Sequence, residues 1–242
     1  MPGSRRPRFT GSALIRLLVQ LTVADVDESR QAFSERLSHW LDWTDAISLA
    51  AALNEAPAGR PGSGASASVA SASASAGERD ALRVRTALAK AIADPLAFAP
   101  DTSETDFASH RRRPVAAQQG MASGIAPLRG RVRQRLAAAG ADMARLAALD
   151  EVMQAVVGAQ ERALLSTVPR LLEKRFQRLR QAHEAPAEPP LPDTPPAVGP
   201  ALWLDTFRRD MQAVLLAELD IRMQPVEGLL AALRAKEPVR HE

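Results

Sequence analysis

Apolar positions recur every three or four residues through most of the chain, which is the spacing of one face of an α-helix. The longest such stretch runs from 127 to 183. Gly140 weakens a helix locally, and Pro169 lacks the amide hydrogen that a helix interior needs. We therefore predict an interrupted helix, with a break or kink at Pro169, where Ser166 or Thr167 can cap a new helix.

Shorter apolar stripes predict further helices at both ends of the chain. Ser12 precedes a stripe that ends at Leu21, and Ser12 is predicted to be the N-cap of that helix. Two more helices are predicted over 28–41 and 45–53, the latter capped by Thr44, with its inward positions at Ile47, Ala50 and Leu53. The last helix is predicted from Ala201 to Met223, with a break or kink at Pro225 and an apolar face that continues to Ala235.

Two segments have the composition of linkers. Residues 55–77 are almost entirely Ala, Ser, Gly and Pro, and residues 184–200 are rich in proline and acidic. Such runs bury too little apolar area to offset their ordering entropy. The predicted organisation is an N-terminal helical unit over 1–54, a linker over 55–77, a central helical region over 78–183, a linker over 184–200, and a C-terminal helical segment over 201–236.

The central region is predicted to begin with a helix over 78–93. Its apolar anchors are expected at Leu82, Leu88 and Ile92, and Pro95 ends it. Residues 95–127 carry an acidic patch and a basic run before Pro114, and they are predicted to be irregular.

Composition supports an all-α fold. Alanine, the best helix former, supplies much of the 46% hydrophobic content, whereas aromatic residues make up only 4%. Because there are no cysteines, disulfides and thiolate metal sites are excluded. The sequence has no run of about 18 apolar residues, so no transmembrane helix is predicted, and we expect a soluble, cytoplasmic protein.

The basic residues are concentrated in the long central stretch. Residues 127–183 hold eleven Arg or Lys and five Asp or Glu. Arg129, Arg131, Arg133 and Arg135 are candidates for nucleic-acid contact through phosphates. Residues two apart on a helix point to different sides, however, so a solvated helix face is the competing interpretation. No aromatic residues alternate with these arginines to stack on bases.

Other residue types give little sign of catalysis. None of the histidines (His39, His110, His183 and His241) has the spacing of helical metal ligands. No phosphate-binding loop or nucleophile motif is present, so we expect neither an enzyme nor a cofactor. The expected function is helix–helix interaction, with the chain itself or with another helical protein. The candidate contact residues are Leu136, Met143, Leu146, Met153, Val156, Trp40 and Trp43. For the two tryptophans, packing in the core is the competing interpretation.

Two stretches, 31–47 (QAFSERLSHWLDWTDAI) and 218–233 (ELDIRMQPVEGLLAAL), resemble an uncharacterised proteobacterial domain family of unknown function. Members of that family tend to be encoded near proteins with OmpA-like peptidoglycan-binding domains. The resemblance implies a cytoplasmic accessory of an envelope-spanning assembly, and it implies no catalytic residue.

Overall fold

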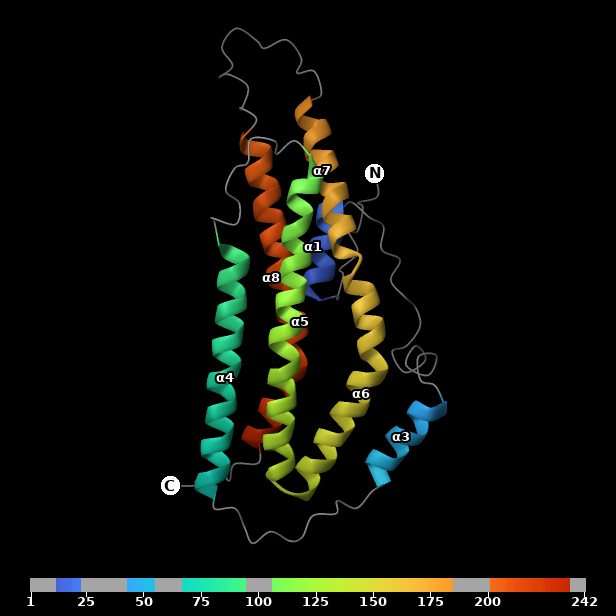
Figure 1. Ribbon diagram of the computed structural model, residues 1–242, viewed down its shortest axis with the longest axis vertical. Helices are drawn as coiled ribbons and strands as arrows, with labels where there is room; N and C mark the ends of the chain where they lie inside the picture. The colour runs from blue at the N-terminus through green and yellow to red at the C-terminus, as the bar shows by residue number, and fades with distance from the viewer. Residues whose placement is uncertain (1–11, 23–42, 55–66, 95–105, 185–200, 236–242) are drawn as a thin grey trace, which may run out of the picture.

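In a computed structural model, the described residues 12–22, 43–54, 67–94, 106–184 and 201–235 form seven helices and no strand. The helices make an elongated bundle (Figure 1). The all-α prediction is therefore confirmed. The helices are α1 (Ala13–Thr22), α3 (Trp43–Asn54), α4 (Ala67–Ala93), α5 (Phe107–Ala138), α6 (Ala141–Leu165), α7 (Val168–Glu184) and α8 (Ala201–Ala235).

Helix α8 is the centre of the bundle. It packs against α1, α4, α5, α6 and α7. Its buried stripe follows the predicted helical spacing and includes Phe207, Met211, Leu215, Leu219 and Met223. The helix continues through Pro225, where a break or kink was predicted, and its apolar face extends to Leu233. Burial of this face on both sides of the proline offsets the hydrogen bond that the proline cannot make.

The prediction that residues 95–127 are irregular is wrong from residue 107 onward. Helix α5 begins there, and the side chain of Asp106 caps it by accepting a hydrogen bond from the amide of Ala108 at 3.2 Å. Pro114 and Pro127 lie inside the helix. A buried apolar face before Pro127, which includes Phe107, Met121 and Ile125, stabilises the helix despite both prolines.

The predicted interruptions of the long central stretch are confirmed. Gly140 lies between α5 and α6 with φ 135° and ψ 174°, a conformation that side chains with a Cβ rarely adopt. Pro169 lies in the first turn of α7. The hydroxyls of Ser166 and Thr167 donate to carbonyls at the end of α6, Ala163 at 2.7 Å and Leu164 at 2.6 Å, so both side chains close α6 instead of capping α7.

The predicted linker over 55–77 is wrong from residue 67, where α4 begins; residues 55–66 lie outside the described part. Alanine favours the helix, and small side chains allow close packing. Ala74 is buried, and a Cβ on Gly77 would lie 2.8 Å from Leu230 Cδ2 of α8. The anchor predicted at Leu82 is also wrong: Leu82 is 66% exposed, and the neighbouring Ala81 is buried.

Helix α1 begins as predicted, because Ser12 Oγ accepts a hydrogen bond from the amide of Ile15 at 3.4 Å. At the C-terminal end of α4, Arg113 Nη2 donates to the carbonyls of Ile92 at 2.5 Å and Asp94 at 3.1 Å. This guanidinium satisfies carbonyls that have no partner within the helix. The predicted helix over 28–41 lies outside the described residues. So does the predicted linker over 184–200, except for Glu184, which is the last residue of α7.

Candidate protein–protein interface

Helix α3 packs on the rest of the molecule mainly through α6. Ala52 is its buried residue, and Asp45 and Leu49 on the same side are half-buried. Ile47, Ala50 and Leu53 were predicted to point inward, and that prediction is wrong because all three are exposed. Alanine allows α3 to lie close to α6, which turns the larger side chains toward solvent.

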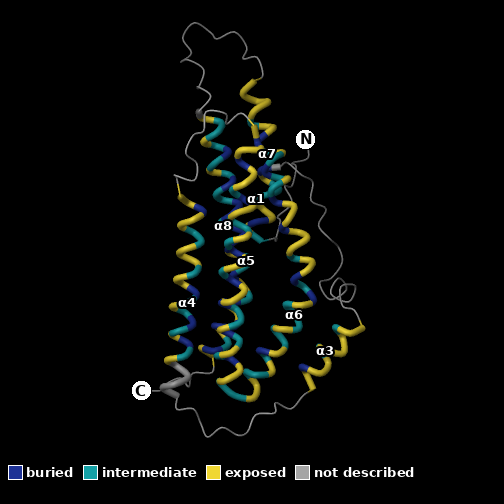
Figure 2. Tube along the Cα trace, viewed as in Figure 1, coloured by how far each residue is buried: buried dark blue, intermediate teal, exposed yellow. Residues whose placement is uncertain are grey.

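The opposite side of α3 is apolar and exposed. Trp43, Ile47 and Leu53 are 78%, 54% and 58% exposed, and Ala46 and Ala50 between them are exposed as well. These five residues, spaced by three or four, form one side of the helix, which we call the α3 face. Figure 2 shows α3 at the side of the bundle with most of its length exposed. The α3 face carries no charged side chain.

Most of the residues predicted to contact another helix do so within this chain. Leu136 belongs to the bundle core, and Met143 and Leu146 pack against it. Val156 is buried and Met153 is half-buried, both on α6. Trp43 lies on the α3 face and is 78% exposed, so the interpretation that it packs in the core is wrong. Trp40 is outside the described residues. Trp43 is therefore the predicted contact residue that the structure leaves widely accessible.

The four arginines that are candidates for nucleic-acid contact do not form one surface, as their spacing of two residues predicts. Arg129 binds Asp150 of α6 through two hydrogen bonds, of 2.9 Å from Nε and 2.6 Å from Nη2. Arg133 Nη1 lies 3.7 Å from the same carboxylate. Arg135 binds Asp80 of α4 at 2.7 Å, and Arg131 is exposed. Three of the four charges are thus used in ion pairs between helices.

Comparison with protein families assigns the whole bundle to one group. A family model described as "Protein of unknown function (DUF3348)" matches residues 1–235. The chain belongs to the DUF3348 family. No curated protein and no solved structure matches it. Among the described helices of this DUF3348 protein, none is long and apolar enough to cross a membrane.

A group of polar side chains lies buried in the core of the DUF3348 bundle. Glu218 of α8 is fully buried, and its Oε1 accepts a hydrogen bond from Arg222 Nε at 2.9 Å. Arg222 Nη2 lies 2.8 Å from the same oxygen and completes the ion pair. Gln118 of α5 donates to both carboxylate oxygens at 3.1 Å and to the carbonyl of Leu165 at 2.8 Å. We call these residues the Glu218 cluster. The cluster was not predicted from the sequence, although an acidic residue in the apolar stripe of α8, four residues before an arginine, is a signal of it.

The Glu218 cluster holds three helices in register. Because the carboxylate has partners on both oxygens, its charge is compensated inside the core. Gln118 also supplies a donor to the last turn of α6, whose carbonyls lack partners within the helix. The described residues contain no group of three His, Cys, Asp or Glu side chains arranged to hold a metal ion.

His110 lies in the first turn of α5. The side chain of His110 is buried. The centroid of its ring lies 5.3 Å from the ring centroid of Phe176 and 5.4 Å from that of Phe207. Phe107 and Trp203 complete this group of rings, and His183 stacks on Trp203 at 6.3 Å. These contacts join the beginnings of α5 and α8 to the middle and the end of α7.

Asp80 lies on α4 beside three arginines. The hydrogen bond from Arg135 lowers the pKa of the Asp80 carboxyl, burial raises it, and the charges of Arg135, Arg83 and Arg131 lower it further. The carboxylate is therefore ionised at neutral pH, and it compensates only part of the positive charge around it.

Proposed function

We propose that this protein is a non-enzymatic helical interaction protein whose contact surface is the α3 face. The observation that carries the proposal is that three large apolar side chains of one helix, Trp43, Ile47 and Leu53, each expose more than half of their surface. The longer helices bury their apolar stripes within the bundle, whereas α3 leaves its widest stripe uncovered. Tryptophan is also enriched among the residues that dominate binding energy at interfaces.

The occupant that we propose for the α3 face is the α3 face of a second copy. Two such faces can meet without like-charge repulsion, because neither carries a charged side chain. In an antiparallel pair, Trp43 of each copy would lie over Leu53 of the other, since ten residues of helix span about 15 Å. Ala46 and Ala50, between these ends, would let the two helices approach closely.

The expected dimer is weak. A stable interface buries about 800 Å² on each partner, and one side of a 12-residue helix supplies less than that. We therefore expect an equilibrium between monomer and dimer that depends on protein concentration. By the resemblance of residues 31–47 and 218–233, we further propose a cytoplasmic scaffold that serves an envelope-associated assembly.

Sedimentation equilibrium of the full chain over a wide concentration range tests the proposal. The average mass of the wild type should rise with protein concentration. At each concentration it should be the same at low and at high salt, because the contact is apolar. Ile47→Asp should give a monomer throughout. Leu164→Asp, at a position on α6 that is 64% exposed, is the matched control and should associate like the wild type.

Two results would contradict the proposed dimer. One is a wild-type monomer at every concentration, which would assign the α3 face to a different protein or to residues outside the described part. The other is association that Ile47→Asp leaves intact, which would place the contact elsewhere on the bundle.

A further inference from the structure

The outward side of α4 carries unbalanced positive charge. Arg79, Arg83 and Lys90 are exposed and share one side of the helix, together with Leu82 and Thr86. We call these five residues the cationic face of α4. They line a shallow hollow with Ala87. The span from Arg79 to Lys90 is eleven residues, or about 16 Å of helix.

The acidic residues of α4 do not neutralise this face. Glu78 pairs with Arg234 of α8 at 3.3 Å, and Asp80 pairs with Arg135 of α5 at 2.7 Å. Asp80 also lies 3.4 Å from Arg83, whose side chain is nevertheless 76% exposed. Arg79 donates from Nε to the carbonyl of Ser75 at 3.3 Å, and no carboxylate in the described part of the chain forms an ion pair with it.

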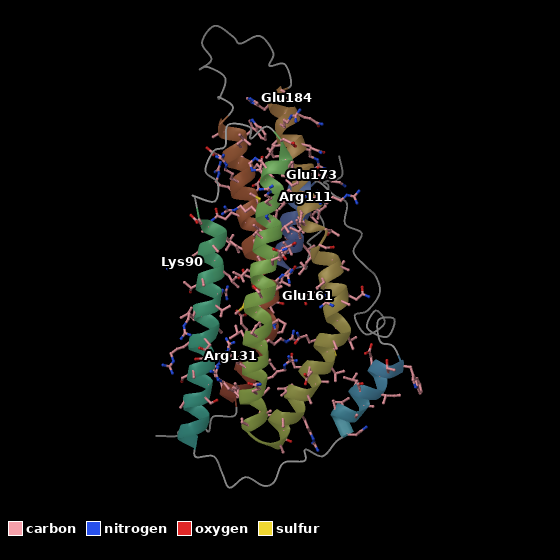
Figure 3. All side chains as sticks on the ribbon, in the orientation of Figure 1. Lys90, Arg111, Arg131, Glu161, Glu173 and Glu184 are labelled. Atoms are coloured by element: carbon pink, nitrogen blue, oxygen red, sulfur yellow. The ribbon has the colours of Figure 1, made fainter. Side chains whose placement is uncertain are left out.

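A neighbouring helix adds to the positive surplus. Arg131 of α5 is exposed, and its charge acts on the carboxylate of Asp80. Figure 3 shows Lys90 on α4 at the edge of the bundle, and Arg131 beside α4 and α5. A ligand of the cationic face therefore has to supply negative charge along at least three turns of helix.

Leu82 distinguishes between the classes of anionic ligand. Its exposed side chain lies among the cations, so the ligand must offer an apolar group between its negative charges. A nucleic-acid backbone offers phosphates alone to such a helix, and none of the described residues on this face is aromatic and able to stack on bases. A membrane surface needs more apolar anchors than one leucine.

We propose that the cationic face of α4 binds an acidic amphipathic helix of a partner protein. The carboxylates of that helix would pair with Arg79, Arg83 and Lys90, and an apolar side chain would pack on Leu82. The inference is independent of the α3 face, because α3 packs on α6 and α4 packs on α5 and α8.

Fluorescence anisotropy with the full chain tests this inference. The probe is a labelled synthetic helix with glutamates spaced by four and seven residues around one leucine, and its control has glutamine in place of glutamate. The wild type should bind the acidic probe, more weakly as salt rises, and should not bind the glutamine probe. A single-stranded DNA oligonucleotide and vesicles of phosphatidylcholine with phosphatidylglycerol are the competing ligands.

Charge reversal locates the site. The triple variant Arg79→Glu, Arg83→Glu, Lys90→Glu should lose roughly tenfold or more in affinity for the acidic probe. The matched control reverses three exposed arginines on α5 and α7 with the same change in net charge, and its affinity should stay within about twofold of the wild type. That control is Arg112→Glu, Arg170→Glu, Arg178→Glu.

Leu82→Ala should weaken binding about threefold to tenfold without changing the salt dependence, because it removes apolar contact and no charge. Ile47→Asp should bind the probe like the wild type, which separates this inference from the proposed function. The inference is overturned if the acidic probe does not bind at low salt, if both triple variants bind alike, or if DNA or the vesicles bind more tightly through the same three cations.

Discussion

Gln118 and Glu218 are a hundred residues apart in sequence, yet Gln118 Nε2 lies 3.1 Å from each carboxylate oxygen of Glu218. The same amide nitrogen lies 2.8 Å from the carbonyl of Leu165. One side chain therefore joins α5, the end of α6 and the middle of α8. Removing this side chain would leave two acceptors without their donor, the buried carboxylate of Glu218 and the last carbonyl of α6.

Gln118→Leu should lower the free energy of unfolding by about 1–3 kcal/mol, the usual cost of leaving buried acceptors without a donor. Urea denaturation monitored by circular dichroism measures the loss. Gln134→Leu, at an exposed position of the same helix, is the control and should change stability by less than about 0.5 kcal/mol. Equal stability of the two variants would show that Gln118 does not support the cluster.

Arg222→Leu should be more costly, about 3–5 kcal/mol, because it leaves the fully buried carboxylate of Glu218 without its counter-charge. Replacing Gln118, Glu218 and Arg222 together by leucine should recover most of that loss, since no unpaired charge remains. The measurement is again urea unfolding. A triple variant less stable than Arg222→Leu would contradict this account of the cluster.

Gly77 and Gly228 should respond in opposite directions to alanine. Gly77→Ala should destabilise the protein by about 1 kcal/mol or more, because the new Cβ would meet Leu230 Cδ2 at 2.8 Å where α4 and α8 pack. Gly228→Ala has no neighbour within 4 Å and should stabilise α8 by about 0.5–1 kcal/mol through helix propensity alone. Thermal unfolding of both variants checks the two signs, and stabilisation by Gly77→Ala would mean that the Leu230 side chain moves away from the new Cβ at little cost.

Asp80 should make stability depend on pH in the acid range. Its pKa is lowered from the ordinary value of 3.8, chiefly by the hydrogen bond from Arg135, so the folded state favours the ionised form. The stability that ionised Asp80 contributes to the folded state is present above pH 3.8. It is lost as the pH falls through the lower pKa that Asp80 has in the folded state.

The wild type should therefore exceed Asp80→Asn in unfolding free energy at neutral pH, and the difference should shrink as the pH falls below 3.8. Urea titrations at a series of pH values measure this difference. Asp142→Asn, whose carboxylate is exposed, is the control and should leave the pH profile unchanged. A difference between wild type and Asp80→Asn that stays constant with pH would contradict the ion pair.

Helical periodicity predicted the elements whose large apolar residues are buried. The prediction of the α8 stripe is confirmed because its large buried side chains recur at helical spacing. The interruptions near Gly140 and Pro169 are confirmed because glycine and proline disfavour the interior of a helix. The beginning of α4 was missed because its small residues pack through close approach, and close approach leaves no apolar stripe. The beginning of α5 was missed because Pro114 and Pro127 suggest an irregular segment, whereas burial of Phe107 and Met121 outweighs their cost.

The candidate sites were harder to predict, because they depend on which side of a helix a neighbour covers. Ile47 and Leu53 have the spacing of buried residues, but α6 covers the side of α3 that carries Ala52. The arginines from 129 to 135 formed the most conspicuous basic run in the sequence. Their acidic partners Asp80 and Asp150 lie on other helices, so only the fold shows that most of this charge is compensated.

The central place of α8 also bears on the order in which the molecule forms during synthesis. A ribosome delivers α1, α4, α5, α6 and α7 before α8, yet each of these helices packs against α8. Until residues 201–235 emerge, the apolar sides of the earlier helices that face α8 stay uncovered. Assembly therefore depends on contacts between residues distant in sequence, which slow folding. The nascent chain exposes apolar surfaces to chaperones for most of its translation.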